Sequence, residues 1–176
     1  MPWKTFSSKK VYKNHWMEVV EDEVETDMGR KLTYGVVRKK PFVVLVPWDG
    51  THLTLVRQYR YPIGRAAWKF PQGHLEHGSI EEAARAELRE ETGLRAKELK
   101  EIERLHLAAS FSSQEGTIFL ATGLTQGEAE REESEEDMEA RQFTLEEFRK
   151  MIESGEMMDC PTIAAWGILV TKELLK

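Results

Sequence analysis

The chain has 176 residues, of which 40% are hydrophobic and 32% charged, and its formal net charge is −6. This length and composition predict one globular domain with a short N-terminal extension, and the negative charge argues against a protein that coats nucleic acid. A single cysteine, Cys160, leaves no disulfide framework within the chain and suits the cytoplasm, and no apolar run predicts a signal peptide or membrane span. We therefore expect a cytoplasmic protein without a membrane partner.

The first 40 residues have the pattern of β structure. Strands are expected at residues 10–13, 16–26 and 31–38, with a turn at Asp27-Met28-Gly29-Arg30 before the last of them. So small a set of strands lacks enough core of its own and needs a partner surface.

Residues 41–47 (PFVVLVP) form an apolar run bounded by prolines, which predicts a buried strand. After the turn signal Asp49-Gly50, residues 53–61 are expected to be its hairpin partner. Strand alternation places Arg57 and Tyr59 on one side and Arg60 on the other. The two arginines indicate either one wet face of the strand or a binding site for phosphate groups, since a guanidinium presents a planar fork of donors.

Residues 68–73 are expected to form a short strand that leads through a glycine-containing loop into an amphipathic helix over residues 81–94. Gly93 is suited to the left-handed residue that ends this helix. Its apolar side is Ala83, Ala84, Leu88 and Leu94.

Glu87, Glu90 and Glu91 fall on one side of that helix, at i, i+3 and i+4. Carboxylates so close repel one another, and folding does not require them there. A hard divalent cation with oxygen ligands would cancel the repulsion. The alternative is a solvated face neutralised by the neighbouring arginines, and the charge pattern alone leaves both open.

The full series, Gly73 followed by Glu87-Leu88-x-Glu90-Glu91-x-Gly93-Leu94, resembles the signature of the Nudix hydrolases. Two departures lie in its first half. Ala86 stands where that family has an arginine, and one residue is missing between Gly78 and Ser79, where the family's first glutamate is expected. Losing both members of a pair can be nearly neutral. A replacement brace is expected from Glu76 with Arg85 or Arg89.

The resemblance implies an α/β fold: a Nudix α/β/α sandwich with a mixed β-sheet, preceded by a small antiparallel β extension. It divides the chain into an extension over residues 1–40, which would mediate a homodimer, and a hydrolase domain over residues 41–176. It also implies a Mg²⁺ ion, or Mn²⁺, held by the backbone carbonyl of Gln72 and by Glu87, Glu90 and Glu91, with the three glutamates also taking part in catalysis.

The segment LVRQYRYPIG…WKFPQGHLE resembles the one that precedes the signature in ADP-ribose pyrophosphatases. By that resemblance Arg60 is expected to contact a diphosphate, and Arg57 is a further candidate for substrate binding. The loop over residues 110–116 is similar in position to a substrate loop of that group and would contribute Glu115, although its proline and glycine are missing.

Residues 127–139 form the most acidic stretch of the chain, which is either a solvated loop or a source of a general base or further metal ligand. The resemblance places such a glutamate here, and the candidates are Glu133, Glu135 and Glu136. Of these Glu136 matches the family's pattern best.

Strands are further expected at residues 98–108, 117–122 and 140–144, followed by two helices. The first starts at the N-cap Thr144 and ends at Gly155, and the second opens at Asp159-Cys160-Pro161-Thr162. The second helix is expected to turn a core face inward, and Cys160 is expected to be a packing residue. That face is Ile163, Trp166, Leu169 and Val170. His74 and His77 lack further ligands at a suitable spacing and are read as surface residues rather than a zinc site.

The sequence thus predicts a divalent-metal-dependent hydrolase that cleaves the diphosphate of a nucleoside diphosphate linked to another moiety. ADP-ribose, giving AMP and ribose 5-phosphate, is the expected substrate. The alternatives are another nucleotide, such as a sugar nucleotide or a dinucleoside polyphosphate, and a nucleotide-binding module without turnover.

Overall fold

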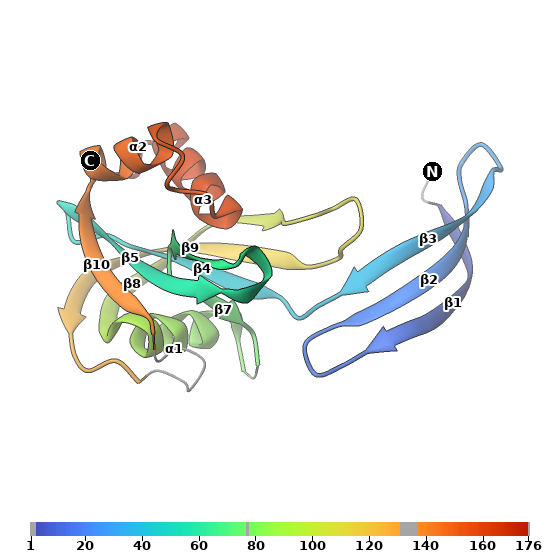
Figure 1. The fold of residues 1–176 in the computed structure, drawn as a ribbon, viewed down its shortest axis with the longest axis horizontal. Helices are drawn as coiled ribbons and strands as arrows, with labels where there is room; N and C mark the ends of the chain where they lie inside the picture. The colour runs from blue at the N-terminus through green and yellow to red at the C-terminus, as the bar shows by residue number, and fades with distance from the viewer. Residues whose placement is uncertain (1–2, 77, 131–136, 176) are drawn as a thin grey trace. The chain divides into compact units, whose positions relative to one another are not determined.

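The computed structural model describes residues 3–76, 78–130 and 137–175. The chain divides into two compact units, one made of Met1–Pro41 with Leu105–Glu115 and the other of Phe42–Arg104 with Gly116–Lys176. Figure 1 shows the elements of each unit.

The first unit is built on an antiparallel sheet in the order β1-β2-β3. Its strands are β1 (Lys4–Lys13), β2 (Glu18–Glu25) and β3 (Lys31–Arg38). All three predicted strands are confirmed, although β1 starts at Lys4 rather than Lys10. Val20 and Val24 of β2 are buried, whereas every residue of β1 is exposed.

A second chain segment completes the first unit. The Tyr34 hydroxyl donates a hydrogen bond to the Ser110 carbonyl at 2.5 Å, and the Val37 amide donates to the Phe111 carbonyl at 2.7 Å. The side-chain amide of Gln114 donates to the Lys40 carbonyl at 2.9 Å. The segment 105–115 therefore holds β3 and the residues after it through hydrogen bonds to the backbone.

The second unit contains two sheets, in the orders β7-β4-β9-β8 and β10-β5-β6. The strand β4 runs parallel to β9 and antiparallel to β7, so the first of these sheets is mixed. The bounds are β4 (Phe42–Pro47), β5 (His52–Arg60), β6 (Arg65–Lys69), β7 (Gln72–His74), β8 (Leu94–His106), β9 (Glu115–Gln126) and β10 (Glu139–Thr144), with a short 3-10 helix, η1 (Tyr61–Ile63), between β5 and β6.

Helices cover both sides of these sheets. In Figure 1, α1 (Ile80–Thr92) lies on one side, and α2 (Leu145–Glu153) and α3 (Cys160–Thr171) lie together on the other. The predicted α/β/α sandwich is therefore confirmed. Beneath α1 the core joins this helix to β4, β8 and β9 through Val43, Leu45, Ala83, Ala84, Leu88, Leu94, Phe119 and Ala121.

Two strand predictions were wrong. The segment β5 is not the hairpin partner of β4, since only the bridge Trp48↔Leu53 joins them and β5 pairs with β6 and β10. Both edges of β4 are already occupied by β7 and β9. Residues 68–73 are likewise not one strand. They divide between β6 and β7 at Pro71, which has no N–H to continue a ladder.

The predicted core face of α3 was also wrong in part. Ile163 and Val170 are 38% and 45% exposed, while Ala165 and Leu169 are fully buried. The helix is apolar around most of its circumference, so the sequence period could not select the inward face. Cys160 is exposed rather than packed, because it is the first residue of the helix.

Candidate metal and substrate site

The loop before α1 brings the backbone at Gly73 against the carboxylate of Glu87. A Cβ atom built on Gly73 would lie 1.7 Å from Oε1 of Glu87 and 2.3 Å from its Oε2. Only a residue without a side chain allows this approach. The glycine that heads the predicted motif therefore has a local physical purpose, which is to let the helix carboxylate lie on the loop backbone.

Glu91 is buried beside a lysine that the sequence reading did not single out. Lys69, the last residue of β6, is 1% exposed, and its ammonium nitrogen lies 2.6 Å from Oε1 of Glu91, which is also 1% exposed. The same nitrogen lies 3.5 Å from the backbone oxygen of Gln72. The other oxygen of Glu91 accepts from the Gln72 amide at 3.1 Å. Two of the predicted metal ligands thus already contact a cation.

The backbone around Gln72 is held in place from the other side of the sandwich. The Phe70 amide donates to Oγ1 of Thr162 at 2.8 Å, and the side-chain amide of Gln72 donates to Oδ1 of Asp159 at 3.3 Å. Asp159 is the N-cap of α3. These residues were missed from sequence. Lys69 follows Trp68 in a strand that also carries the exposed Arg65, so its charge did not single it out, and Asp159 and Thr162 read only as a helix start.

The start of the acidic stretch is tied to the C-terminal end of α1. The Gly127 amide donates to the Gly93 carbonyl at 2.9 Å, and the Gln126 side chain donates to the Thr92 carbonyl at 3.0 Å. Nε of Arg89 lies 3.2 Å from Oε2 of Glu130, within ion-pair distance although it makes no hydrogen bond there. The candidates Glu133, Glu135 and Glu136 lie outside the described residues.

The replacement brace expected from Glu76 stays a prediction, but the contacts of Arg85 are described. Arg85 donates to the carboxylate of Glu81 at 2.9 Å and to the Ala96 carbonyl at 3.0 Å. The loop end is fixed by a capping box, in which Ser79 and Glu82 satisfy each other's backbone N–H groups. Hydrogen bonds from the Ser79 backbone and then its hydroxyl lower the pKa of Glu82 below its ordinary 4.5.

The two strand arginines lie on opposite faces of β5, as predicted. Arg57 is exposed and pairs in register with Trp68, whereas Arg60 shares a face with the buried Val56, the register partner of Lys69. Because side chains alternate along β5, Arg60 and not Arg57 lies on the face of the sheet from which Lys69 points toward α1. Arg57 instead lines a cavity of about 430 Å³, together with Arg65, Ala66, Ala67, Trp68, Ser154, Gly155, Glu156 and Met158.

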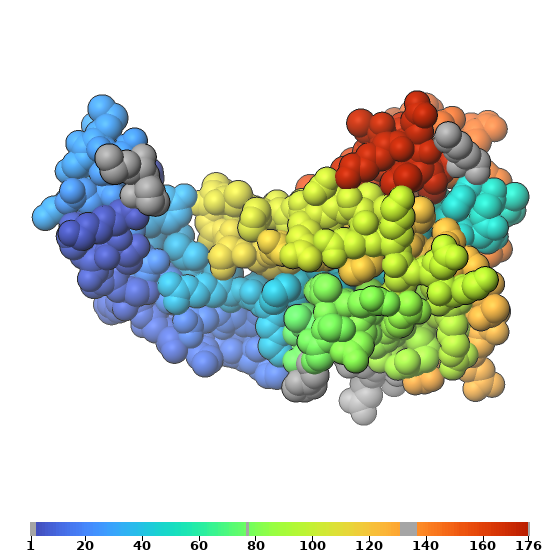
Figure 2. All heavy atoms as spheres, turned by 180° about the vertical axis from the view of Figure 1, so that it is seen from behind, coloured from blue at the N-terminus to red at the C-terminus, as the bar shows by residue number. Residues whose placement is uncertain are grey.

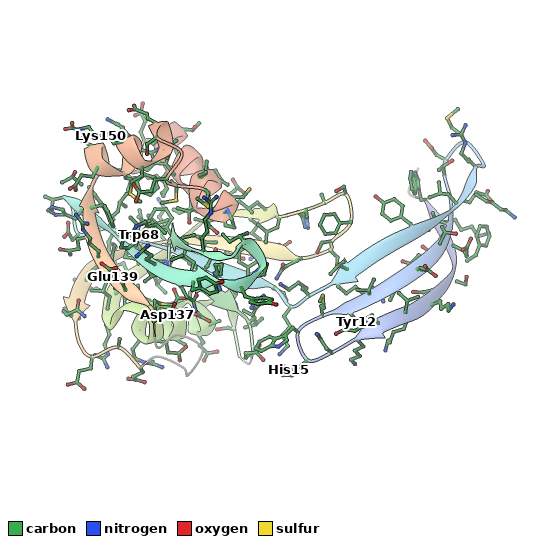
Figure 3. The ribbon with its side chains drawn as sticks, viewed as in Figure 1. Tyr12, His15, Trp68, Asp137, Glu139 and Lys150 are labelled. Carbon is green, nitrogen blue, oxygen red and sulfur yellow. The ribbon has the colours of Figure 1, made fainter. Side chains whose placement is uncertain are left out.

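Trp68, Asp137 and Glu139 are labelled in Figure 3. Oδ2 of Asp137, just before β10, accepts from the Tyr59 amide at 3.1 Å. This contact ties the described end of the acidic stretch to β5. Glu115, the remaining substrate candidate, is the first residue of β9 and belongs to the first unit.

The donor set suits a hard divalent cation in chemical type, because it consists of carboxylate oxygens and a backbone carbonyl. The ammonium of Lys69 also shows that positive charge is stable between Glu91 and the Gln72 carbonyl. Among the described residues, however, no three His, Cys, Asp or Glu side chains gather closely enough to hold a metal ion by themselves. Figure 2 shows α1, drawn in green, at the surface of its unit.

Comparison with known protein families gives two matches along the chain. Residues 38–159 match the family described as NUDIX domain, and residues 3–37 match the one described as nucleoside diphosphate sugar hydrolase N-terminal domain. No helix within the described part of the chain is long and apolar enough to cross a membrane.

The chain is similar over nearly its whole length to curated proteins. It is 32% identical to an ADP-ribose pyrophosphatase of Bacillus subtilis, covering 98% of this chain and 95% of that protein. It is 30% identical to an ADP-ribose pyrophosphatase of Mycobacterium tuberculosis, covering 95% and 82%. A crystal structure of an ADP compounds hydrolase shares the fold, with a TM-score of 0.85 at 23% identity, covering 99% of this chain and 95% of that one.

Proposed function

The chain belongs to the Nudix family, and we propose that it is a pyrophosphohydrolase that cleaves ADP-ribose to AMP and ribose 5-phosphate. The observation that carries the proposal is the structure around α1. In this helix Glu87 lies against the loop backbone at Gly73, Glu91 accepts from the Gln72 amide, and the helical period places Glu90 on the same side. The similarity to ADP-ribose pyrophosphatases over nearly the full chain supports the choice of substrate.

Glu87, Glu90, Glu91 and the carbonyl of Gln72 would hold the divalent cation that the family uses, and we propose Mg²⁺, or Mn²⁺, in that place. Such an ion supplies Lewis acidity toward a phosphoryl oxygen and makes bound water a better nucleophile. The capping box at Ser79 fixes the start of the helix that carries the three glutamates.

One arginine of β5 would bind and orient the diphosphate. We propose Arg60 for this contact, because strand alternation places it on the face that Lys69 turns toward α1. A guanidinium there can donate two parallel hydrogen bonds to a phosphoryl group. Arg57 would bind the part of the substrate that reaches the cavity beside Trp68. Glu115 is proposed as a substrate contact and Glu136 as a general base.

We further propose a homodimer formed through the N-terminal strands. The first unit exposes Phe6, Tyr12 and Trp16 by 49%, 51% and 62%. Exposed aromatic residues on a small sheet are characteristic of protein interfaces. A cytoplasmic location is proposed from the single cysteine.

A panel of substrates tests the function. ADP-ribose, several sugar nucleotides and a dinucleoside polyphosphate are incubated with Mg²⁺ or Mn²⁺, and phosphomonoester products are measured as phosphate released by an added phosphatase. We expect ADP-ribose to have the highest kcat/KM. The match of residues 3–37 to the nucleoside diphosphate sugar hydrolase N-terminal domain favours sugar nucleotides as the second candidate class. Tight nucleotide binding without any turnover would contradict the enzyme reading.

A matched pair of variants on α1 tests the site. Glu87→Gln should lower kcat/KM at least about 100-fold, since even residues that only support metal ligands cost 10- to 100-fold. Glu81→Gln is the control, because Glu81 lies on the same helix, pairs with Arg85 and is 56% exposed. Equal activity of both variants would remove Glu87 from the reaction.

A further inference from the structure

The strand β6 lies at the edge of its sheet and borders a cavity that is separate from the glutamates of α1. The sheet order β10-β5-β6 leaves one side of β6 without a neighbouring strand. The cavity has a volume of about 430 Å³, which is in the usual range for small-molecule sites, and residues 154–158 between α2 and α3 form its other wall. Residues from both faces of the sheet line it, since Arg65 is the register partner of Arg60 and Arg57 lies on the opposite face.

The backbone of β6 presents hydrogen-bonding groups to this cavity. In an antiparallel pair, two residues in register either exchange hydrogen bonds or both direct their N–H and C=O groups away from each other. The Tyr59 amide donates to the carboxylate just before β10, so it points away from β6, and its register partner Ala66 points away from β5. Trp68 alternates back to the same side, and the Phe70 amide after it donates to Thr162 in agreement with this direction. Ala66 and Trp68 therefore each offer a donor and an acceptor along the free edge.

The charged side chains around the cavity are basic on balance. Arg57 and Arg65 contribute two guanidinium groups, and Glu156 is the only carboxylate among the described residues that line it. Within the described part of the chain, neither guanidinium makes a hydrogen bond or ion pair. The chain as a whole has a net charge of −6, so a basic lining does not follow from its composition. Two guanidinium groups without a partner suit an anionic ligand, and their planar forks match phosphate oxygens.

An aromatic wall completes this set of groups. Trp68 lines the cavity and also an adjoining one of about 350 Å³, to which Arg141 and Lys150 contribute further positive charge (Figure 3). The indole ring is held by an edge-on contact with Phe143, at 4.9 Å between ring centroids. An aromatic surface, arginines and a paired donor and acceptor are the groups that recognise the base and the phosphate of a nucleotide.

We propose that this cavity binds the adenosine monophosphate group of a nucleotide. Adenine offers an adjacent acceptor and donor, N7 and the N6 amino group, to the N–H and C=O groups on the edge of β6. Arg57 and Arg65 hold the phosphate. This group has two sources, the AMP half of bound ADP-ribose and the free AMP that the reaction releases. The inference rests on the proposed function for the choice of adenine and deepens it.

Calorimetry with AMP as the probe tests the site. The full-length protein is titrated in the presence of EDTA, so that neither a divalent ion nor turnover contributes to the heat. Arg65→Gln should weaken AMP binding at least about 10-fold, because a charged hydrogen bond to the phosphate is lost. Arg149→Gln is the control, since this exposed arginine of α2 does not line the cavity, and it should bind AMP as the unaltered protein does. Equal affinity in Arg65→Gln and the control, or no binding of AMP, would overturn the proposal.

A second variant and two further probes test the base contact. Ala66→Met fills part of the cavity without changing its charge and should also weaken AMP binding at least about 10-fold, with a Tm that shows the chain to be folded. Adenosine and ribose 5-phosphate should each bind the unaltered protein more weakly than AMP, because each lacks one of the two recognised parts. Ribose 5-phosphate that binds as tightly as AMP would overturn the assignment to a nucleotide.

Steady-state kinetics with ADP-ribose distinguishes the two sources. If the AMP half of the substrate occupies the cavity, Arg65→Gln should raise KM in parallel with its Kd for AMP. If free AMP occupies it, KM should stay unchanged although AMP binding is weakened. Turnover of ADP-ribose with AMP binding that does not depend on Arg65 would refute the site and leave the enzyme reading intact. Binding of AMP that depends on Arg65, without turnover of any nucleotide, would keep the site and refute the hydrolase.

Discussion

Replacing Gly73 by alanine should impair the reaction while leaving the stability of the fold almost unchanged. The added Cβ would lie 1.7 Å from Oε1 of Glu87, whereas ordinary contacts begin at 3.4 Å, so the carboxylate must retreat by roughly 1.7 Å. The atoms that must move are the far end of a flexible side chain, and Gly73 does not have the positive φ of Gly78 or Gly93. We therefore expect the free energy of unfolding to change by less than about 1 kcal/mol.

The effect on the reaction should be much larger. A displacement of about 1 Å in a catalytic group can cost about 100-fold in rate, so kcat/KM for ADP-ribose should fall at least that much in Gly73→Ala. The affinity for Mn²⁺ should fall as well, because Glu87 is one of the proposed ligands.

The assay compares steady-state hydrolysis, Mn²⁺ titration and thermal unfolding of Gly73→Ala with those of Gly167→Ala. Gly167 lies inside α3, and a Cβ there would meet nothing within 4 Å. This control should keep full activity and gain about 0.5–1 kcal/mol, the usual gain of alanine over glycine within a helix. Normal activity and metal affinity in Gly73→Ala would refute the reasoning, since they would show that the reaction does not need Glu87 where the structure places it.

Three further changes have expected outcomes. Gly93→Ala should lower the free energy of unfolding by about 1–3 kcal/mol, because φ at this residue is 75° and backbone atoms lie 2.5 and 3.0 Å from the added Cβ. Urea titration measures this, and an unchanged midpoint of unfolding would contradict the expectation. Glu82→Gln should lower the stability above pH 4.5, and the loss should become smaller as the pH falls. Ser79 lowers the pKa of the folded Glu82 carboxylate, so the carboxylate's contribution to stability is lost when it is protonated. A difference in Tm between variant and unaltered protein that stays constant down to about pH 3 would refute this expectation. Thr162→Val should cost about 1–3 kcal/mol by leaving the Phe70 amide without its acceptor, and a wild-type Tm would count against that contact.

The elements that were predictable from sequence are those specified by local signals. The strand β3 has the predicted bounds, Gly93 ends α1 with the expected left-handed φ, and Thr144 caps α2. Each depends on a few neighbouring residues and on backbone preferences that the sequence expresses directly.

The pairing of strands was not predictable in the same way. A turn at Asp49-Gly50 suggested a hairpin between β4 and β5, but the edges of β4 are taken by β7 and β9, which arrive later in the chain. Lys69 was missed for a related reason. Its partner Glu91 lies 22 residues further on, so nothing local distinguishes a buried ion pair from a lysine on a wet strand. The positions of the helix glutamates on one face were predictable from period alone, whereas their contacts were not.

The first unit is built from two segments that lie far apart in the sequence, and this affects the order in which the chain folds during synthesis. The Tyr34 hydroxyl and the Val37 amide find their partners only at Ser110 and Phe111, more than 70 residues later. While the ribosome makes the intervening strands and α1, the three N-terminal strands must wait with these groups exposed to water. Domains generally fold as units and from the N-terminus during synthesis. Here the first segment to emerge cannot be completed until most of the sheet that carries the glutamate helix has also emerged.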